Sequence, residues 1–392
     1  MTAVGPLLAR ATPESTLPPA PPRIAALDGL RAIAMLLVVA VHCYSMVPAL
    51  PGSAGQDFFR RIASLGYTGV DLFFVLSGLL IGGILLDHRS SPRLLPAFYA
   101  RRCLRILPVY LLLLAFFYLC RGIPGLNATD HGAYFRSRVP DWCYFVFVQN
   151  VAMAWIYSVG PAWLGPTWSL AVEEQFYLAA PALIRRLSVV QVAWCSGLVI
   201  ALSPVLRLFT LEYVHNPLAG VYLLVTRADG LMWGVLCACL LRSATVRAGL
   251  QRRGAVLTTL IVGGCVVFGY ASLQHYPPGS PQMLGWGYSA LSAWFAAIVL
   301  GVMLFPQAWA AQLLGWRPLT IIGVTSYFSY LFHFPILLLL HWLFFHAPPQ
   351  NINWQTGGVT ALAIFMTLAA AWVSGRWFDG PLTRLGRCFS YE

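Results

Sequence analysis

Residues 27–42 read LDGLRAIAMLLVVAVH, an apolar stretch that begins with Asp28 and Arg31 and ends with His42. The run is apolar enough to lie in a membrane as a helix. Because a helix rises about 1.5 Å per residue, the step from Arg31 to His42 makes about three turns, which places both side chains on one face, ~16 Å apart. A charged side chain at mid-bilayer costs roughly 2.5–3.5 kcal/mol, so it needs a partner or a function. A snorkelling arginine and a hydrogen-bonded core histidine are the structural alternative.

The composition of the whole chain also indicates a membrane protein. The 392 residues are 59% hydrophobic and only 10% charged, with a mean hydropathy of +0.71. This is too little charge to cover a soluble domain of this length. The apolar runs are continuous and do not alternate, which excludes a β-barrel. We predict an all-α polytopic transmembrane bundle of about ten spans. The expected spans are 29–48, 67–86, 104–120, 167–184, 189–209, 218–241, 254–273, 288–308, 319–345 and 356–375.

The basic residues indicate how these spans are oriented. All 25 are arginines, and the net charge is +12. A net positive charge of this size could indicate nucleic-acid binding. The arginines lie in short loops, however, where they set the membrane topology and contact anionic lipid headgroups. If both termini are cytoplasmic and 142–158 does not cross, 18 arginines lie on the cytoplasmic side and 6 on the opposite side. The positive-inside rule favours this arrangement, with 142–158 re-entrant or packed at the outer surface.

The ends of the chain and the cysteines add smaller expectations. Residues 1–26 contain PESTLPPAPPR and are expected to form a disordered cytoplasmic tail and not a signal peptide. Residues 27–385 form the predicted transmembrane domain, and 386–392 form a second cytoplasmic tail. The nine cysteines lie mostly in apolar runs without metal-ligand spacing, so we expect no metal site and no redox role.

Further charged groups lie at the ends of the second and third spans. Asp71, in GYTGVDLFFVLSGLLIGG, is expected near the depth of His42, where a carboxylate could orient the imidazole. An N-terminal acid favoured by the helix dipole is the alternative. Arg102 and Arg105, in FYARRCLRILP, are i,i+3 neighbours that could hold a phosphate or a carboxylate. Ordinary cytoplasmic charge explains the same pair.

The strongest anomaly is a pair of adjacent acids, Glu173 and Glu174, inside the apolar run PTWSLAVEEQFYLAAP. Adjacent helical side chains point about 100° apart, so the two cannot face one partner. Trp168 and Ser169 precede them by about one and a half turns. A structural role for both glutamates is the less favoured reading.

Two more spans contain polar residues. His333, in SYFSYLFHFPILL, lies mid-span, where a hydrogen-bonded core histidine is the favoured reading. Arg227 and Asp229, in TRADGLMWG, are expected to form structural ion pairs with other helices.

Together these motifs resemble the acyltransferase 3 family, the integral-membrane O-acyltransferases of bacteria. The family's basic-x10-His motif falls on Arg31 and His42, its RxxR motif on Arg102 and Arg105, and its WSLxxEE motif on 168–174. The matching strings occur in the family's order across residues 27–385: LDGLRAIAMLLVVAVH, GYTGVDLFFVLSGLLIGG, FYARRCLRILPVY, PTWSLAVEEQFYLAAP, TRADGLMWGVLCA and SYFSYLFHFPILL.

The sequence departs from the family pattern in three places. Ala32 replaces the last glycine of LDGLRG, and Asp379 replaces a glutamate in WFDGP. No hydrolase-like domain of the kind found in large two-domain members follows the last span in this sequence.

The resemblance implies transfer of an acetyl or longer acyl group from cytoplasmic acyl-CoA, the donor substrate, to a hydroxyl of a sugar, polysaccharide, macrolide or peptidoglycan. A tunnel would join arginines that hold the CoA phosphates to His42, the general base; an acyl-histidine intermediate is a variant. The candidate residues are His42, Asp71, Glu173 and Glu174 for catalysis, Arg31, Arg102 and Arg105 for the donor, and Trp168, Ser169 and His333 for substrate binding.

We therefore expect a multi-pass O-acetylation enzyme of the bacterial cytoplasmic (inner) membrane. Its partners would be acyl-CoA, a carbohydrate acceptor, membrane lipids and polysaccharide-synthesis machinery, and not nucleic acid. A surface polysaccharide or its lipid-linked precursor is the first expected acceptor, and a macrolide or other small glycosylated metabolite is the second. The rival class is a proton-coupled transporter or flippase, which would also use intramembrane charges. A sensor or scaffold is a third possibility.

Overall fold

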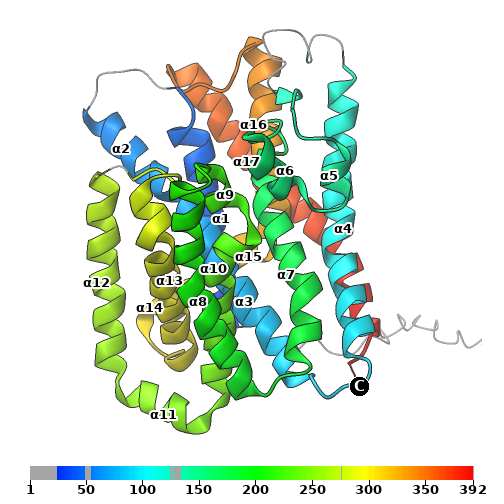
Figure 1. The fold of residues 1–392 in the computed structure, drawn as a ribbon. Helices are drawn as coiled ribbons and strands as arrows, with labels where there is room; N and C mark the ends of the chain where they lie inside the picture. The colour runs from blue at the N-terminus through cyan, green and yellow to red at the C-terminus, as the bar shows by residue number, and fades with distance from the viewer. Residues whose placement is uncertain (1–23, 49–53, 124–125, 127–133, 275, 392) are drawn as a thin grey trace, which may run out of the picture.

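The computed structural model describes residues 24–48, 54–123, 126, 134–274 and 276–391. Within these ranges the long helices lie side by side in one bundle, and shorter helices connect them or lie at their ends (Figure 1). The predicted tail at 1–26 lies outside the described residues except for its last three positions, where the first helix begins at Ala25.

The bundle is built from the following elements, in chain order. The first half comprises α1 Ala25–Ala40, η1 Val41–Ser45, α2 Ala54–Ser64, η2 Leu65–Thr68, α3 Gly69–Asp87, α4 Leu94–Arg121, α5 Trp142–Phe145, α6 Gln149–Ile156, η4 Gly165–Thr167, α7 Trp168–Ile184 and α8 Val189–Glu212. The second half comprises α9 Pro217–Tyr222, α10 Leu224–Arg242, α11 Ala244–Arg252, α12 Gly254–Leu273, η5 Met283–Gly287, α13 Tyr288–Leu304, α14 Trp309–Leu314, α15 Arg317–Val324, α16 Ser326–Phe345, α17 Trp354–Trp377, α18 Asp379–Leu385 and η6 Gly386–Cys388.

Nine helical segments in the described part of the chain are long and apolar enough to cross a membrane, which confirms a polytopic helical bundle. They correspond to nine of the ten predicted spans. The remaining one, 167–184, is α7, whose 17 residues extend about 25 Å, slightly less than a typical hydrocarbon core. Segment 142–158 forms α5 and α6, with 4 and 8 residues, which are too short to cross.

The helices differ in how far they are buried. The most apolar stretches of the segments containing α1 and α3 are 67% and 72% buried, whereas that of α12 is only 6% buried. The side chains of Leu260, Val262 and Val266 on α12 are exposed although they are apolar. In a bilayer such a surface contacts lipid chains, so the exposed apolar helices form the perimeter and α1 and α3 form the centre.

Close contact between α3 and α10 depends on two glycines. A Cβ on Gly78 would lie 1.9 Å from the carbonyl oxygen of Leu231, and one on Gly234 would lie 2.1 Å from that of Val75. Only glycine allows the two backbones to approach this closely. This contact fixes which residues of α3 face α10.

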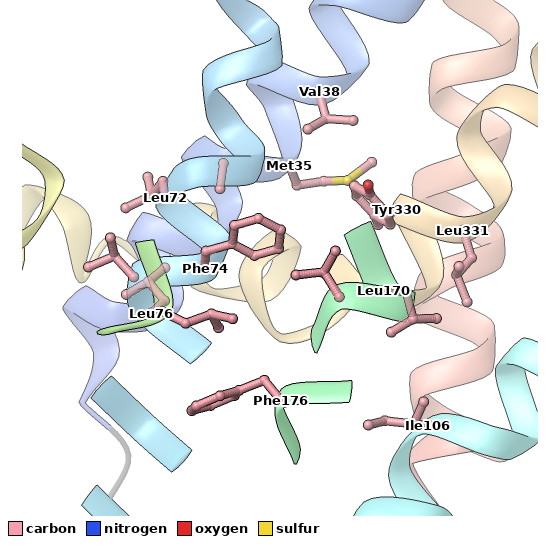
Figure 2. Packing of buried hydrophobic residues seen from close by; sticks show 14 of the residues in the cluster. Met35, Val38, Leu72, Phe74, Leu76, Ile106, Leu170, Phe176, Tyr330 and Leu331 are labelled. Atoms are coloured by element: carbon pink, nitrogen blue, oxygen red, sulfur yellow. The ribbon is translucent and has the colours of Figure 1, made fainter. Parts of the chain in front are cut away.

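The core between the central helices is filled by large apolar side chains (Figure 2). Met35 and Val38 come from α1, and Leu72 and Phe74 come from α3; all four are at most 1% exposed. The Met35 side chain points toward Tyr330 of α16 (Figure 2). Thus α1 packs against both α3 and α16, and α16 carries His333, the neighbour of His42.

The predicted C-terminal tail, 386–392, packs against the bundle as far as residue 391. The ring of Tyr391 stacks on His88, with centroids 4.4 Å apart, and lies 4.3 Å from the guanidinium carbon of Arg101. Arg101 Nε also donates to the carbonyl oxygen of Phe389 at 2.8 Å. Burial raises the pKa of the Tyr391 phenol, so this ring stays neutral beside the arginine.

Candidate active site

His42 lies where α1 changes from an α-helix to the π-helical turn η1. π-helical turns are rare and occur often at functional sites, because they change the direction of a side chain within a continuous helix. The Nδ1 atom of His42 lies 2.8 Å from the carbonyl oxygen of Val38. The histidine is half-buried.

A second histidine, His333 of α16, contacts His42 directly. Its Nε2 atom lies 3.2 Å from Nδ1 of His42, and the ring centroids are 5.0 Å apart. Its Nδ1 atom lies 2.8 Å from the carbonyl oxygen of Tyr330. The sequence predicted that His333 is a core histidine hydrogen-bonded to a neighbour. In the structure that neighbour is His42, the histidine of the basic-x10-His motif.

The acceptors around the two rings assign their tautomers. A carbonyl oxygen can only accept, so Nδ1 of His333 carries a hydrogen, and its Nε2 has a lone pair. By the same argument Nδ1 of His42 carries a hydrogen, which is shared between Val38 O and His333 Nε2. The Nε2 atom of His42 is then left with a lone pair. A neutral imidazole with a free lone pair is the form that a general base requires.

Ser169 joins the histidine-bearing helix to the start of α7. Its Oγ lies 2.6 Å from the hydroxyl oxygen of Tyr330, and the Tyr330 hydroxyl lies 2.9 Å from the carbonyl oxygen of Pro166. Ser169 Oγ also lies 3.3 Å from the same carbonyl oxygen, so the two hydroxyl groups and this carbonyl form one hydrogen-bonded cluster. Tyr330 precedes His333 by three residues, so this cluster holds the helical turn that carries His333.

The turn η1 is also held by Asn351, a residue that the sequence did not single out. Its Nδ2 atom donates to the carbonyl oxygen of Cys43 at 2.8 Å. Its Oδ1 atom accepts from Thr360 Oγ1 at 2.7 Å, and Thr360 also bonds to His341 at 3.0 Å. These bonds fix the loop before α17 against the residue next to His42.

The structure contradicts the expected contact between Asp71 and His42. The Asp71 carboxylate instead pairs with Arg227 of α10 at 2.5 Å, and both side chains are 2% exposed. The α3–α10 contact turns this face of α3 toward α10, and a buried carboxylate is most stable beside a guanidinium. The groups that orient His42 are Val38 and His333.

Trp168 belongs to the same ion-pair region. Its ring lies 5.8 Å from the guanidinium carbon of Arg227 and packs edge-on against Phe74. The second predicted ion pair joins Asp229 to Arg207 of α8 at 2.9 Å, with side chains 1% and 0% exposed. Arg207 is one of the six arginines counted on the opposite side from the sequence. Its burial beside Asp229 indicates a structural role within the bundle.

The two glutamates have different surroundings, as their helical spacing predicts. Glu173 accepts hydrogen bonds from Ser77 Oγ at 2.8 Å and from the Tyr177 hydroxyl at 3.1 Å. Glu174 lies within electrostatic reach of Arg102 and Tyr327. Within the described residues its Oε1 atom is buried and has no hydrogen-bond partner. Glu173 is therefore fixed between α3 and α7, and Glu174 faces α4.

The predicted donor-binding arginines lie on the same side of the bundle as Glu173. Arg31 bonds to Asp28 at 3.1 Å and keeps 22% of its side chain exposed. Arg31 and Arg102 both lie within electrostatic reach of Glu173, and Arg102 packs over the ring of Tyr177 at 5.5 Å. Arg105 interacts with Asp379, the residue that departs from the family pattern. The structure thus brings the basic-x10-His arginine and the RxxR motif together.

The face of α1 between Arg31 and His42 is packed in this conformation. Met35 and Val38, which follow Arg31 by one and two turns, are 0% and 1% exposed. A cavity of about 10 Å³, room for about one water molecule, adjoins His333. It is lined by Met35, Leu36, Val39, Cys43, His333, Ile364, Thr367 and Leu368. Passage of an acyl group along this face therefore requires Met35 to move.

Comparison with known proteins agrees with these features. A family model for an acyltransferase domain, acyltransferase 3, matches residues 24–376. This chain belongs to the acyltransferase 3 family. The matched region includes both histidines, all three donor-side arginines and both glutamates.

Several curated relatives of this chain are named as O-acetyltransferases. It is 28% identical to peptidoglycan O-acetyltransferase OatA of Listeria monocytogenes over 385 residues, which cover 93% of this chain and 56% of that protein. It is 29% identical to the putative peptidoglycan O-acetyltransferase YrhL of Bacillus subtilis, covering 94% and 56%. It is 25% identical to O-acetyltransferase OatA of Staphylococcus aureus, covering 92% and 57%. The chain thus spans little more than half the length of these relatives, and no solved structure matches it.

Proposed function

We propose that this multi-pass membrane protein transfers an acetyl group from cytoplasmic acyl-CoA to a hydroxyl of a cell-surface polysaccharide or its lipid-linked precursor. The observation that carries the proposal is the arrangement along α1. A histidine pair lies toward one end, and Arg31 with Arg102 and Glu173 lies toward the other. Transfer from a phosphorylated thioester requires cationic side chains that bind the phosphates of the donor and a base that takes the proton of the acceptor hydroxyl. The names of the relatives support acetyl as the group and a glycan as the acceptor.

On the donor side, Arg31, Arg102 and Arg105 would hold the CoA phosphates. Guanidinium groups suit this task because they stay charged and present several donors to phosphate oxygens. Glu173 lies close enough to Arg31 and Arg102 to fix their positions. The pantetheine arm would then run along α1 toward His42, with Met35 displaced.

At the histidine pair, the reaction would proceed by general base catalysis. Nε2 of His42 accepts the proton of the acceptor hydroxyl while its oxygen attacks the thioester carbonyl carbon. The C–S bond then breaks, and the CoA thiolate takes the proton back from Nε2. The charge that His42 carries between these steps is stabilised by Val38 O and His333 Nε2, both of which accept from Nδ1.

The acceptor would enter from the side opposite the arginines. Two of the relatives are named for peptidoglycan, so a cell-wall glycan is the first acceptor to test. A small glycosylated metabolite is the second. We place the enzyme in the bacterial cytoplasmic membrane with both termini inside, because the arginine count favours that orientation.

A transporter would use its intramembrane charges differently. Asp71 and Arg207 already have buried partners of opposite charge, Arg227 and Asp229. Buried ion pairs of this kind support a structural role, so these charges do not favour a transporter.

The proposal is tested with purified protein in detergent, labelled acetyl-CoA and glycan acceptors, compared between His42→Asn and His346→Asn. His346 is an exposed histidine with left-handed backbone geometry, which asparagine tolerates, so it is a matched control. We expect transfer by the wild type and by His346→Asn, and none by His42→Asn. Transfer by His42→Asn would exclude the assigned base, and transport in sealed vesicles without transfer in detergent would favour the rival class.

A further inference from the structure

The α3–α4 and α7–α8 connections lie at the end of the bundle where the C-terminus lies (Figure 1). Residues of these two connections line a basic hollow. Its volume is about 400 Å³. It is lined by Arg89, Ser90, Arg185, Arg186, Leu187 and Ser188. None of these residues belongs to the donor motifs, so the mechanism above leaves the hollow unused.

The charge in this hollow is strongly one-sided. Three guanidinium groups line it, and the described lining residues include no carboxylate. The nearest acid in the sequence, Asp87, is already paired with Arg242 at 2.6 Å and 2.8 Å. Arg89 is half-buried and donates to the carbonyl oxygen of Leu187 at 3.4 Å, which holds it against the opposite connection. The described residues that line the hollow therefore carry positive charge and no negative charge.

The donor groups of the site suit a phosphate group better than a carboxylate-bearing side chain. Arginines from two different connections line it, and so do Ser90 and Ser188, which carry hydroxyl groups. A phosphate has several acceptor oxygens and can bond to donors on more than one side at once. The start of α8, a 24-residue helix, adds the positive end of its dipole at Ser188.

We propose that the hollow formed by Arg89, Arg185 and Arg186 is a phosphate-binding site. Two sources of phosphate fit this chemistry at a membrane surface: the headgroup of an anionic phospholipid, or the nucleotide part of a soluble ligand. The second source would lie close to the donor arginines. Tyr99, one turn before Arg102 on α4, donates to the carbonyl oxygen of Leu178 on α7. Arg185, at the end of α7, follows Leu178 by seven residues, or about 10 Å along the helix. The site does not depend on the proposed acyl transfer, because it would bind phosphate even if no transfer occurred.

The test compares two triple variants of the full chain in phosphatidylcholine nanodiscs. One removes the hollow, Arg89→Gln with Arg185→Gln and Arg186→Gln. The matched control removes three exposed arginines from the neighbouring surface at the same end, Arg247→Gln with Arg252→Gln and Arg253→Gln, and so changes the net charge equally. Calorimetric titration with 3′,5′-ADP measures the soluble arm. Native mass spectrometry in discs containing phosphatidylglycerol counts retained anionic lipids in the second arm.

We expect the hollow variant either to lose about tenfold or more of the affinity for 3′,5′-ADP or to retain fewer anionic lipids, and the control to stay within about twofold of the wild type in both measurements. The arm that responds identifies the source. Equal losses in both triple variants would show general surface charge and overturn the proposal. Wild-type protein that binds neither probe, or a hollow variant that binds both normally, would also overturn it. Because these assays measure binding alone, their failure is distinguishable from failure of acetyl transfer.

Discussion

Replacement of His333 by leucine separates the role of the histidine pair from simple packing. Leucine is similar in size to histidine and fits a site that is 3% exposed, but it cannot accept the hydrogen on Nδ1 of His42. In the proposed reaction that nitrogen belongs to a cation for part of the cycle. The lost interaction is therefore a hydrogen bond to a charged group, which contributes about 1.5–3 kcal/mol.

This loss predicts a kcat lower by about 10- to 150-fold, since each 1.4 kcal/mol corresponds to about tenfold in rate. The effect should not be complete, because Val38 O still accepts from Nδ1 of His42 at 2.8 Å. His333→Gln, whose amide oxygen can accept, should recover part of the rate. The KM for acetyl-CoA should remain within about twofold of the wild type in both variants, because His333 contacts no donor-side arginine.

The assay is steady-state transfer of labelled acetyl groups in detergent, with thermal unfolding of each variant as a check on folding. A folded His333→Leu protein with wild-type kcat would refute the argument, as would a change confined to KM. Equal activities of the leucine and glutamine variants would show that acceptance of the Nδ1 hydrogen is not what matters.

Three further changes test other parts of the structure. Asp71→Asn leaves Arg227 buried without its counter-ion, so the free energy of unfolding should fall by about 3–5 kcal/mol. The variant should therefore unfold at a lower temperature in detergent, and an unchanged unfolding temperature would contradict a buried ion pair. Met35→Trp should block the face of α1 and abolish transfer, whereas Met35→Ala should keep activity and accept longer acyl donors. A series of acyl-CoA chain lengths measures this, and equal activity of the two variants would exclude passage of the acyl group at this position. Arg102→Gln should raise the KM for acetyl-CoA about tenfold with little change in kcat, and an unaltered KM would assign this arginine to topology alone.

The membrane spans could be predicted because hydrophobicity is a local property of the chain. Nine of the ten expected spans appear as long helices, and the tenth, α7, is a helix of the expected position but of marginal length. The prediction that 142–158 does not cross rested on arginine counting, and the short helices α5 and α6 agree with it. Each of these conclusions needs only the residues of one segment.

Parts of the candidate site could also be found locally. His42, Glu173 and Arg31 stand out because ionisable groups are expensive inside a membrane, so their presence indicates partners or function. The sequence could not show which partners they have. Asp71 was expected beside His42 but pairs with Arg227, because the glycine contact between α3 and α10 determines which way that face of α3 points.

By itself, then, the sequence determined that the chain is a helical membrane protein, where its helices run and which polar residues are out of place. Only the tertiary structure decided that His42 meets His333, 291 positions away, that Ser169 holds Tyr330, and that Asn351 supports the turn carrying His42. The physical reason is that insertion of a helix depends on its own composition. The pairing of buried polar groups depends instead on which helix faces touch, and this is set by the packing of the whole bundle.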